Sequence, residues 1–138
     1  EGEGAALDYG YHEPIARGQM AREMAAADAA RQAGARLLVQ DTDLLSTVVY
    51  CGHYYDRCPS WLAEAARARR PDLYLLLEVD VPWVADDVRD RGDRQEEVQQ
   101  LFRDAAAASE SPVTVVMGSW DDRLRLAIDA VDRLLRAR

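Results

Sequence analysis

A short segment rich in tryptophan, aspartate and arginine follows an apolar stretch near the middle of this chain. It runs from Val81 to Arg91 and contains Trp83, Asp86 and Arg89. A loop that only connects two elements favours small, turn-forming residues instead. Arginine carries a permanent charge on a planar fork of donors that matches phosphate oxygens, and tryptophan offers a flat face for a ring. The segment therefore indicates an enzyme that handles phosphate groups.

Two aspartates, Asp41 and Asp43, end an apolar stretch earlier in the chain. An apolar strand that ends in aspartate is typical of sites where a carboxylate holds magnesium beside nucleotide phosphates. We therefore predict an active-site role for at least one of the two. The alternative for Asp43 is structural, because aspartate at such a position frequently caps the following helix.

Further side chains could complete a phosphate site. Arg89, Arg91 and Arg94 could close over transferred phosphates, as a lid does in phosphoryl transfer. The alternative is a solvated charged loop whose arginines make weak ion pairs with neighbouring aspartates. Trp83 and Trp120 could each stack on a ring, although structural packing is the more common use of tryptophan.

The composition is that of an ordinary soluble domain. The chain has 138 residues, 49% of them hydrophobic and 30% charged, with a formal net charge of −8. This acidic balance argues against nonspecific nucleic-acid binding, and no apolar run approaches the length of a membrane span. All 17 basic residues are arginine, which excludes a Schiff-base lysine and a lysine-containing Walker A loop within these residues.

The cysteines Cys51 and Cys58 are too few for a disulfide framework, so we expect a reducing cytoplasm. With His53 they could be imagined as three zinc ligands. Their spacing fits no common zinc site, and we interpret them as structural.

Helical and strand patterns alternate along the chain. Helices are expected over 15–33, from 44 towards 54, over 59–69, over 94–108 and over the last residues, where apolar side chains recur at helical spacing. Continuous apolar runs predict buried strands over 36–40, 73–77 and 113–117. The alternation predicts an α/β fold with a parallel sheet covered by helices.

Parallel sheets of this kind bind ligands beyond the carboxyl ends of their strands. Three segments occupy such places: Asp41–Asp43, 78–91 and Gly118–Asp121. All three hold polar or aromatic residues that can contact a ligand, and this coincidence is stronger evidence than any one motif.

Several short stretches carry a resemblance to a known family. They are Leu7-Asp8-Tyr9, Ile15–Gln19, Asp41–Thr47, Asp72–Leu76, Pro82–Asp86 with Arg89, and Asp122-Arg123. In this order they resemble the ribosylnicotinamide kinase domain of NadR-type proteins, a branch of the P-loop kinases. The Pro-Trp-Val-Ala-Asp stretch with Arg89 is the most specific part.

The resemblance implies a three-layer P-loop kinase-like parallel sheet flanked by helices. The first strand, the P-loop and the second strand of the family would precede Glu1, so residues 1–138 are expected to form a single, incomplete kinase domain that is inactive alone. The implied reaction is transfer of the γ-phosphate of ATP to the 5′-hydroxyl of nicotinamide riboside, which gives nicotinamide mononucleotide for NAD synthesis.

The resemblance also implies roles for individual residues. Asp41 is the first candidate for the magnesium-linked carboxylate and Asp43 the second, while Arg89 and Arg91 would stabilise charge on the transferring phosphoryl group. The substrate would be contacted by Asp8, Trp83 and Asp86. The ATP adenine would lie by Gly118, Ser119, Trp120 and Arg123.

Three other interpretations stay open from the sequence. The same fold could phosphorylate another nucleoside or small metabolite, since related kinases share the aspartate-ended strand and the arginine lid. It could instead be a non-catalytic module that senses ATP for an attached domain, or a remnant without activity.

Overall fold

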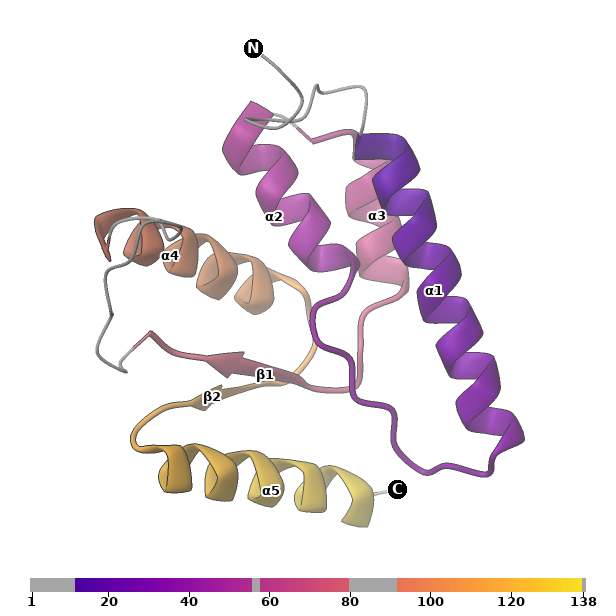
Figure 1. The fold of residues 1–138 in the computed structure, drawn as a ribbon, viewed down its shortest axis with the longest axis vertical. Coiled ribbons are helices and arrows are strands. Elements are labelled where there is room, and N and C mark those ends of the chain that lie inside the picture. Colours follow the sequence, from indigo (N-terminus) through magenta and orange to yellow (C-terminus); the bar gives the residue numbers. More distant parts are fainter. Residues whose placement is uncertain (1–11, 56–57, 80–91, 138) are drawn as a thin grey trace. The chain divides into compact units, whose positions relative to one another are not determined.

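The structure is a computed structural model that describes residues 12–55, 58–79 and 92–137. The chain divides into two compact units, Glu1–Arg70 and Pro71–Arg138. In order, the described elements are three helices, a strand, a helix, a strand and a last helix (Figure 1). The assignment of residues 1–138 to a single domain stays a prediction.

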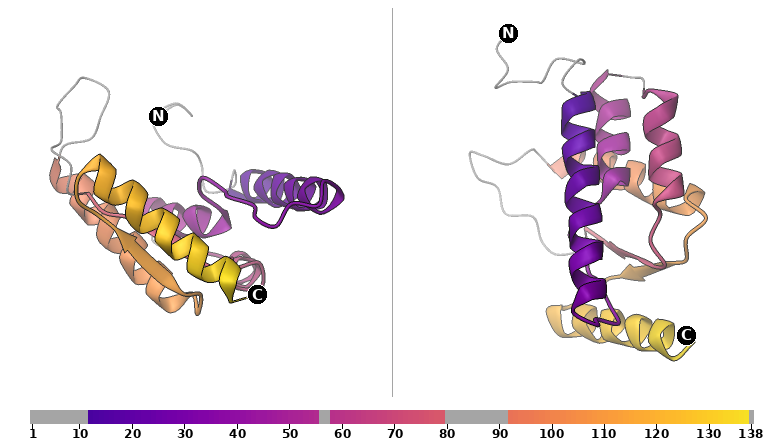
Figure 2. Two further views of the ribbon diagram at one scale, coloured as in Figure 1. Left: turned by 90° about the horizontal axis from the view of Figure 1, so that it is seen from below. Right: turned by 90° about the vertical axis from the view of Figure 1, so that its right-hand side faces the viewer.

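The first unit is built from helices α1 (His12–Gln32), α2 (Leu44–Tyr55) and α3 (Ser60–Ala68), which lie side by side (Figure 2). Each was predicted from the sequence to within a few residues. Their shared core contains one residue from α1 and two each from α2 and α3: Ala16, Leu44, Cys51, Leu62 and Ala66. Leu44 and Leu62 are fully buried, so the apolar faces of the short helices α2 and α3 supply most of the core volume.

Helix α1 ends at Gln32, two residues before Gly34, the glycine that the sequence predicted would close it. The backbone of Gly34 has a φ of 72°, a left-handed conformation that glycine adopts without steric penalty. The Gly34 N–H donates to the carbonyl of Arg31, and the Ala35 N–H donates to that of Ala30. This pair of bonds is the Schellman arrangement, which satisfies carbonyls that the helix end leaves open.

The strand predicted over 36–40 is wrong. Residues 37–40 have no regular secondary structure, and β1 and β2 pair only with each other in the part of the chain that the structure describes. Leu37, Leu38 and Val39 are exposed rather than buried. Apolar residues favour a strand but do not define one, because a strand also requires a neighbour to accept its backbone hydrogen bonds.

The second unit contains β1 (Tyr74–Leu77), α4 (Gly92–Ala108), β2 (Val113–Val116) and α5 (Trp120–Arg136). The strands are parallel, with Tyr74 opposite Val113 and Leu77 opposite Val116. Helix α4 packs on β1 and α5 packs on β2, so the small sheet lies between the two helices (Figures 1 and 2). This arrangement confirms the α/β class and the parallel pairing, whereas the described sheet has two strands.

The apolar stripe of α5 is only partly covered. The helix was predicted correctly, but Leu124 and Ile128 on its stripe are exposed, and its buried residues are Arg123 and Ala130. Strands of four residues are shorter than a helix of 17 residues, so the two-stranded sheet cannot cover the whole apolar stripe of α5.

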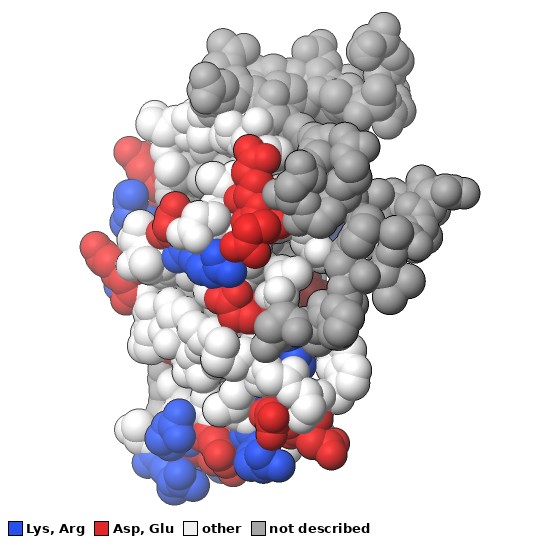
Figure 3. Space-filling view, turned by 90° about the vertical axis from the view of Figure 1, so that its left-hand side faces the viewer, with Lys and Arg blue, Asp and Glu red and all other residues white. Residues whose placement is uncertain are grey.

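Charges of both signs are mixed on the surface. On the face drawn in Figure 3, the arginines of α5 lie among aspartates of the same helix. Two such pairs within single helices are Arg125 with Asp122 and Arg31 with Asp28. Across the described ranges, none of the helices has both the length and the apolar character needed to cross a membrane.

Replacing Glu110 by glycine is expected to stabilise the protein by about 1 kcal/mol. Glu110 follows the end of α4 with a φ of 71°, a left-handed conformation that glycine adopts more easily than glutamate. Glu97→Gly is the matched control, because Glu97 is exposed inside α4 and glycine there lowers stability by up to about 1 kcal/mol. Urea denaturation of both variants measures the effects. Destabilisation by Glu110→Gly would contradict this account of the α4 terminus.

Candidate functional site

The turn that contains Asp41 and Asp43 is locally strained. Thr42 between them has a φ of 71°, which is unusual for a β-branched residue. Such backbone outliers cluster at functional sites. The carboxylate Oδ1 of Asp43 accepts a hydrogen bond of 3.0 Å from the Leu45 N–H, and the Asp43 carbonyl accepts one from Ser46. Asp43 therefore caps α2, as the structural alternative predicted.

Asp41 has a different environment. Its residue is exposed, and within the described residues its side chain has no hydrogen-bond or ion-pair partner. An unengaged carboxylate fits a magnesium ligand, because magnesium takes oxygen ligands and usually combines one or two carboxylates with water and phosphate oxygens. No group of three His, Cys, Asp or Glu side chains able to hold a metal occurs in the described ranges.

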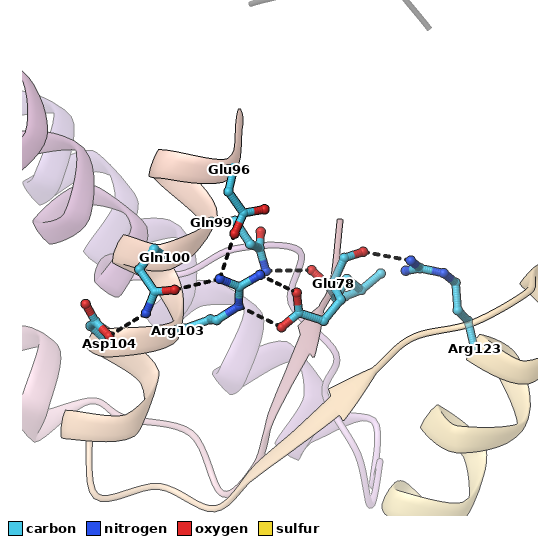
Figure 4. Close-up of polar contacts among 8 residues, drawn as sticks. Glu78, Glu96, Gln99, Gln100, Arg103, Asp104 and Arg123 are labelled. Atoms are coloured by element: carbon cyan, nitrogen blue, oxygen red, sulfur yellow. Dashed lines mark hydrogen bonds and ion pairs between the residues drawn. The ribbon is translucent and has the colours of Figure 1, made fainter. Parts of the chain in front are cut away.

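In the second unit, Glu78 is the first residue after β1 and is held through three of its groups, of which Figure 4 shows the carboxylate and the carbonyl. Its N–H donates to the Val116 carbonyl of β2 at 2.9 Å, which extends the parallel ladder by one bond. Its carbonyl accepts a 2.7 Å bond from Nη2 of Arg123. Its carboxylate, which is mostly buried, is bound by Arg103 of α4.

The Arg103 contact is bidentate. Nε and Nη2 of Arg103 donate to the two carboxylate oxygens of Glu78 at 2.9 and 2.7 Å, while Nη1 donates to Glu96 and Gln100. The bonds to Glu78 and then to Glu96 raise the pKa of Arg103 further above its ordinary value. Parallel bonds from a planar guanidinium fix orientation as well as distance. Gln99 of the same helix donates a hydrogen bond to the Leu77 carbonyl, so side chains of α4 bind the end of β1 at two residues, Leu77 and Glu78.

Arg123 connects the ends of the two strands. Its residue is buried, and its guanidinium donates to the Gly118 carbonyl at 3.0 Å as well as to the Glu78 carbonyl. The same guanidinium lies over the ring of Trp120, 5.5 Å from its centroid, and Trp120 is itself 70% exposed. The structure thus brings together the predicted residues Gly118, Trp120 and Arg123 at the carboxyl end of the sheet.

The turn between β2 and α5 has a fixed geometry. Gly118 has a φ of 97°, and a Cβ added there would lie 2.9 Å from the Asp122 carboxylate, so a side chain is excluded on both counts. Ser119 and Asp122 form a reciprocal capping box at the start of α5. Hydrogen bonds from Arg125 and then from Ser119 lower the pKa of the Asp122 carboxyl. The turn presents the Trp120 ring to solvent at a defined position.

Comparison with protein families identifies the group to which this arrangement belongs. Residues 1–123 match the family model described as AAA domain. The chain belongs to the AAA domain family. AAA domains of this kind are P-loop NTPase-like, which supports a nucleotide-related function and the P-loop superfamily expected from the sequence. Among proteins of curated function, no match is found.

Five of the predicted site residues of this AAA domain lie outside the described residues: Asp8, Trp83, Asp86, Arg89 and Arg91. Their roles stay predictions. Conversely, the sequence analysis included Glu78 only as the first residue of the candidate segment 78–91 and gave it no role, and it did not select Arg103. They are 25 positions apart, and no local spacing signals their contact.

The thiol of Cys58 in this AAA domain is expected to be unreactive near neutral pH. Burial, followed by the charge and hydrogen bond of Cys51, raises its pKa from 9.0 to about 11. The pKa of this thiol is higher in the folded chain than in the unfolded chain, so the protonated thiol makes its full contribution to stability below pH 9. That contribution is lost as the pH rises from about 9 to about 11. In the Cys51→Ala protein, the rate of alkylation by iodoacetamide across this pH range measures the thiolate fraction of Cys58. The midpoint of that titration should lie above 9.0, because Cys58 keeps the burial that raises its pKa. Rapid alkylation at pH 7 would contradict this assignment.

Proposed function

We propose that the full-length protein transfers the γ-phosphate of ATP to the 5′-hydroxyl of nicotinamide riboside, in a reducing cytoplasm. The observation that supports a nucleotide-dependent reaction is the match of residues 1–123 to the AAA domain family. The choice of nicotinamide riboside rests on the resemblance of the Pro82–Asp86 stretch with Arg89 to NadR-type kinases. The phosphates would be held by the P-loop that the resemblance to NadR-type kinases implies.

In this proposal Asp41 is the carboxylate that holds magnesium with the ATP phosphates. Its exposure and its lack of a partner among the described residues support it over Asp43, whose Oδ1 caps α2. Magnesium supplies neutralisation of charge on the β- and γ-phosphates. Arg89 and Arg91 stabilise the transferring group, and Asp8, Trp83 and Asp86 contact the nucleoside.

The adenine of ATP is proposed to lie by the turn after β2. Gly118 allows close approach because it carries no side chain, and Trp120 offers an exposed ring for stacking. Ser119 and Arg123 keep the turn in place through the capping box and the bonds to backbone carbonyls.

A substrate panel tests the proposal. The full-length protein is incubated with magnesium and γ-labelled ATP together with nicotinamide riboside, adenosine, cytidine, uridine or no acceptor, and the products are separated by chromatography. Labelled nicotinamide mononucleotide as the main product is the expected result. Preferred labelling of another nucleoside would move the assignment to a different kinase, and ATP binding without any labelled product would favour a sensing module.

A further inference from the structure

Three hydrogen bonds from arginine side chains converge on one residue at the end of β1 that the proposed chemistry does not use. Glu78 receives two charge-assisted bonds on its carboxylate and one on its carbonyl (Figure 4). Only 14% of its side chain is exposed, against 61% for Glu96, the other carboxylate that Arg103 contacts. The Glu78 carboxylate is therefore largely removed from water, whereas 29% of the Arg103 side chain stays exposed.

A pair of this kind is weak evidence for stability, because the desolvation of both charges offsets their attraction. Its better-attested effect is to select one conformation of the chain, since a conformation that leaves one of the two charges without its partner is unfavourable. Here the arrangement that is fixed is the direction in which the chain leaves β1. The bond from Gln99 to the Leu77 carbonyl acts on the same point.

The constraint reaches the second strand through Arg123. One guanidinium is shared between the carbonyls of Glu78 and Gly118 and lies against the Trp120 ring. A displacement of the end of β1 would therefore break a bond that also orients the turn after β2. Arg103, Glu78 and Arg123 form one continuous chain of contacts from α4 to the exposed ring of Trp120.

We infer that Glu78 and Arg103 are positioning residues for nucleotide binding. This inference rests on the proposed function and deepens it. It states that an ion pair away from the phosphates helps to hold the adenine. The pair keeps the end of β1 in the position that Arg123 requires, and Arg123 in turn holds the Gly118 turn and Trp120 in the geometry that accepts a ring.

The test is the dissociation constant of magnesium-ATP for the full-length protein, measured by titration calorimetry well below the Tm of each variant. Glu78→Gln and Arg103→Ala are each expected to raise Kd about tenfold, and the double variant little more than either single one. Glu96→Gln is the matched control, because it removes the exposed carboxylate partner of the same arginine and should change Kd less than about twofold. A purely structural role would lower Tm and leave the Kd of the folded protein unchanged.

Arg103→Lys replaces Arg103→Ala in the test if the alanine variant fails to fold, because lysine keeps the positive charge but cannot make the bidentate contact of a guanidinium. We expect it also to weaken binding. Folded Glu78→Gln and Arg103→Lys proteins that bind ATP as tightly as the parent would overturn the inference and leave the proposed function standing. A parent protein that binds no ATP would overturn both.

Discussion

Replacing Asp41 by asparagine is expected to lower kcat for phosphoryl transfer at least about 100-fold in the full-length protein. Asparagine has nearly the same shape but no charge, so it binds magnesium poorly beside nucleotide phosphates. The KM for the nucleoside should change little, because the proposed carboxylate acts on the transferring phosphate and not on the acceptor. Initial rates over a range of nucleoside concentrations, at saturating magnesium-ATP, measure both constants.

Two further variants make this result specific. Asp43→Asn keeps the helix cap, since asparagine caps as well as aspartate, and we expect it to lose less than about tenfold in kcat. Asp28→Asn removes an exposed carboxylate of α1 that pairs with Arg31 of the same helix, and should leave kcat unchanged. A larger loss from Asp43→Asn than from Asp41→Asn would reverse the assignment of the two aspartates.

Replacing Arg123 by alanine is expected to destabilise the protein by about 2–4 kcal/mol. The change removes the donors for two backbone carbonyls at the ends of β1 and β2 and opens space around a buried side chain. Lysine at this position should recover only part of the loss, because a single ammonium cannot reproduce the two bonds of the guanidinium fork. Chemical denaturation followed by far-ultraviolet circular dichroism measures the free energy of unfolding.

Arg125→Ala is the matched control for Arg123→Ala. Arg125 lies two positions further along the same helix, with 66% of its side chain exposed and an ion pair to Asp122. Its removal should change stability by no more than about 0.5 kcal/mol. Equal effects of the two substitutions would show that the bonds of Arg123 to the strand ends contribute little.

Local patterns were sufficient to predict the helices and the strand pair. Helix α5 carries its signals in sequence, with Ser119 and Asp122 at capping-box spacing and apolar residues at helical intervals. Gly34 marks the end of α1 by its freedom to adopt a positive φ. The alternation of strand and helix around residues 74–116 predicted parallel pairing, because a parallel pair needs a crossover of this length.

Features that depend on contacts between residues far apart in the sequence could not be predicted. Leu37, Leu38 and Val39 have the composition of a buried strand, but composition cannot supply a pairing neighbour. Glu78 and Arg123 are 45 positions apart, and their contact exists only because β1, β2 and α5 meet. Arginine is ordinarily assigned to a surface or a ligand, so the burial of Arg123 against two backbone carbonyls left no trace in the sequence.

The candidate site was predicted in part. The rule that ligands bind beyond the carboxyl ends of parallel strands selected Gly118 and Trp120, whereas Arg123 was selected by the family resemblance; the structure places all three together, and their role in binding stays a prediction. The sequence kept both aspartates of the 41–43 turn as candidates, and the bond from the Leu45 N–H to Asp43 identifies Asp43 as the capping residue. That distinction depends on where α2 begins, which a pattern gives only to within a few residues.

The most direct test of the central claim is a phosphorus NMR time course of the full-length protein with magnesium, ATP and nicotinamide riboside. The account predicts that the ATP signals decline while those of ADP and nicotinamide mononucleotide rise in equal amounts, and that the Asp41→Asn protein shows neither change on the same time scale. Release of inorganic phosphate without nicotinamide mononucleotide, or an unchanged ATP spectrum with the folded parent protein, would contradict it.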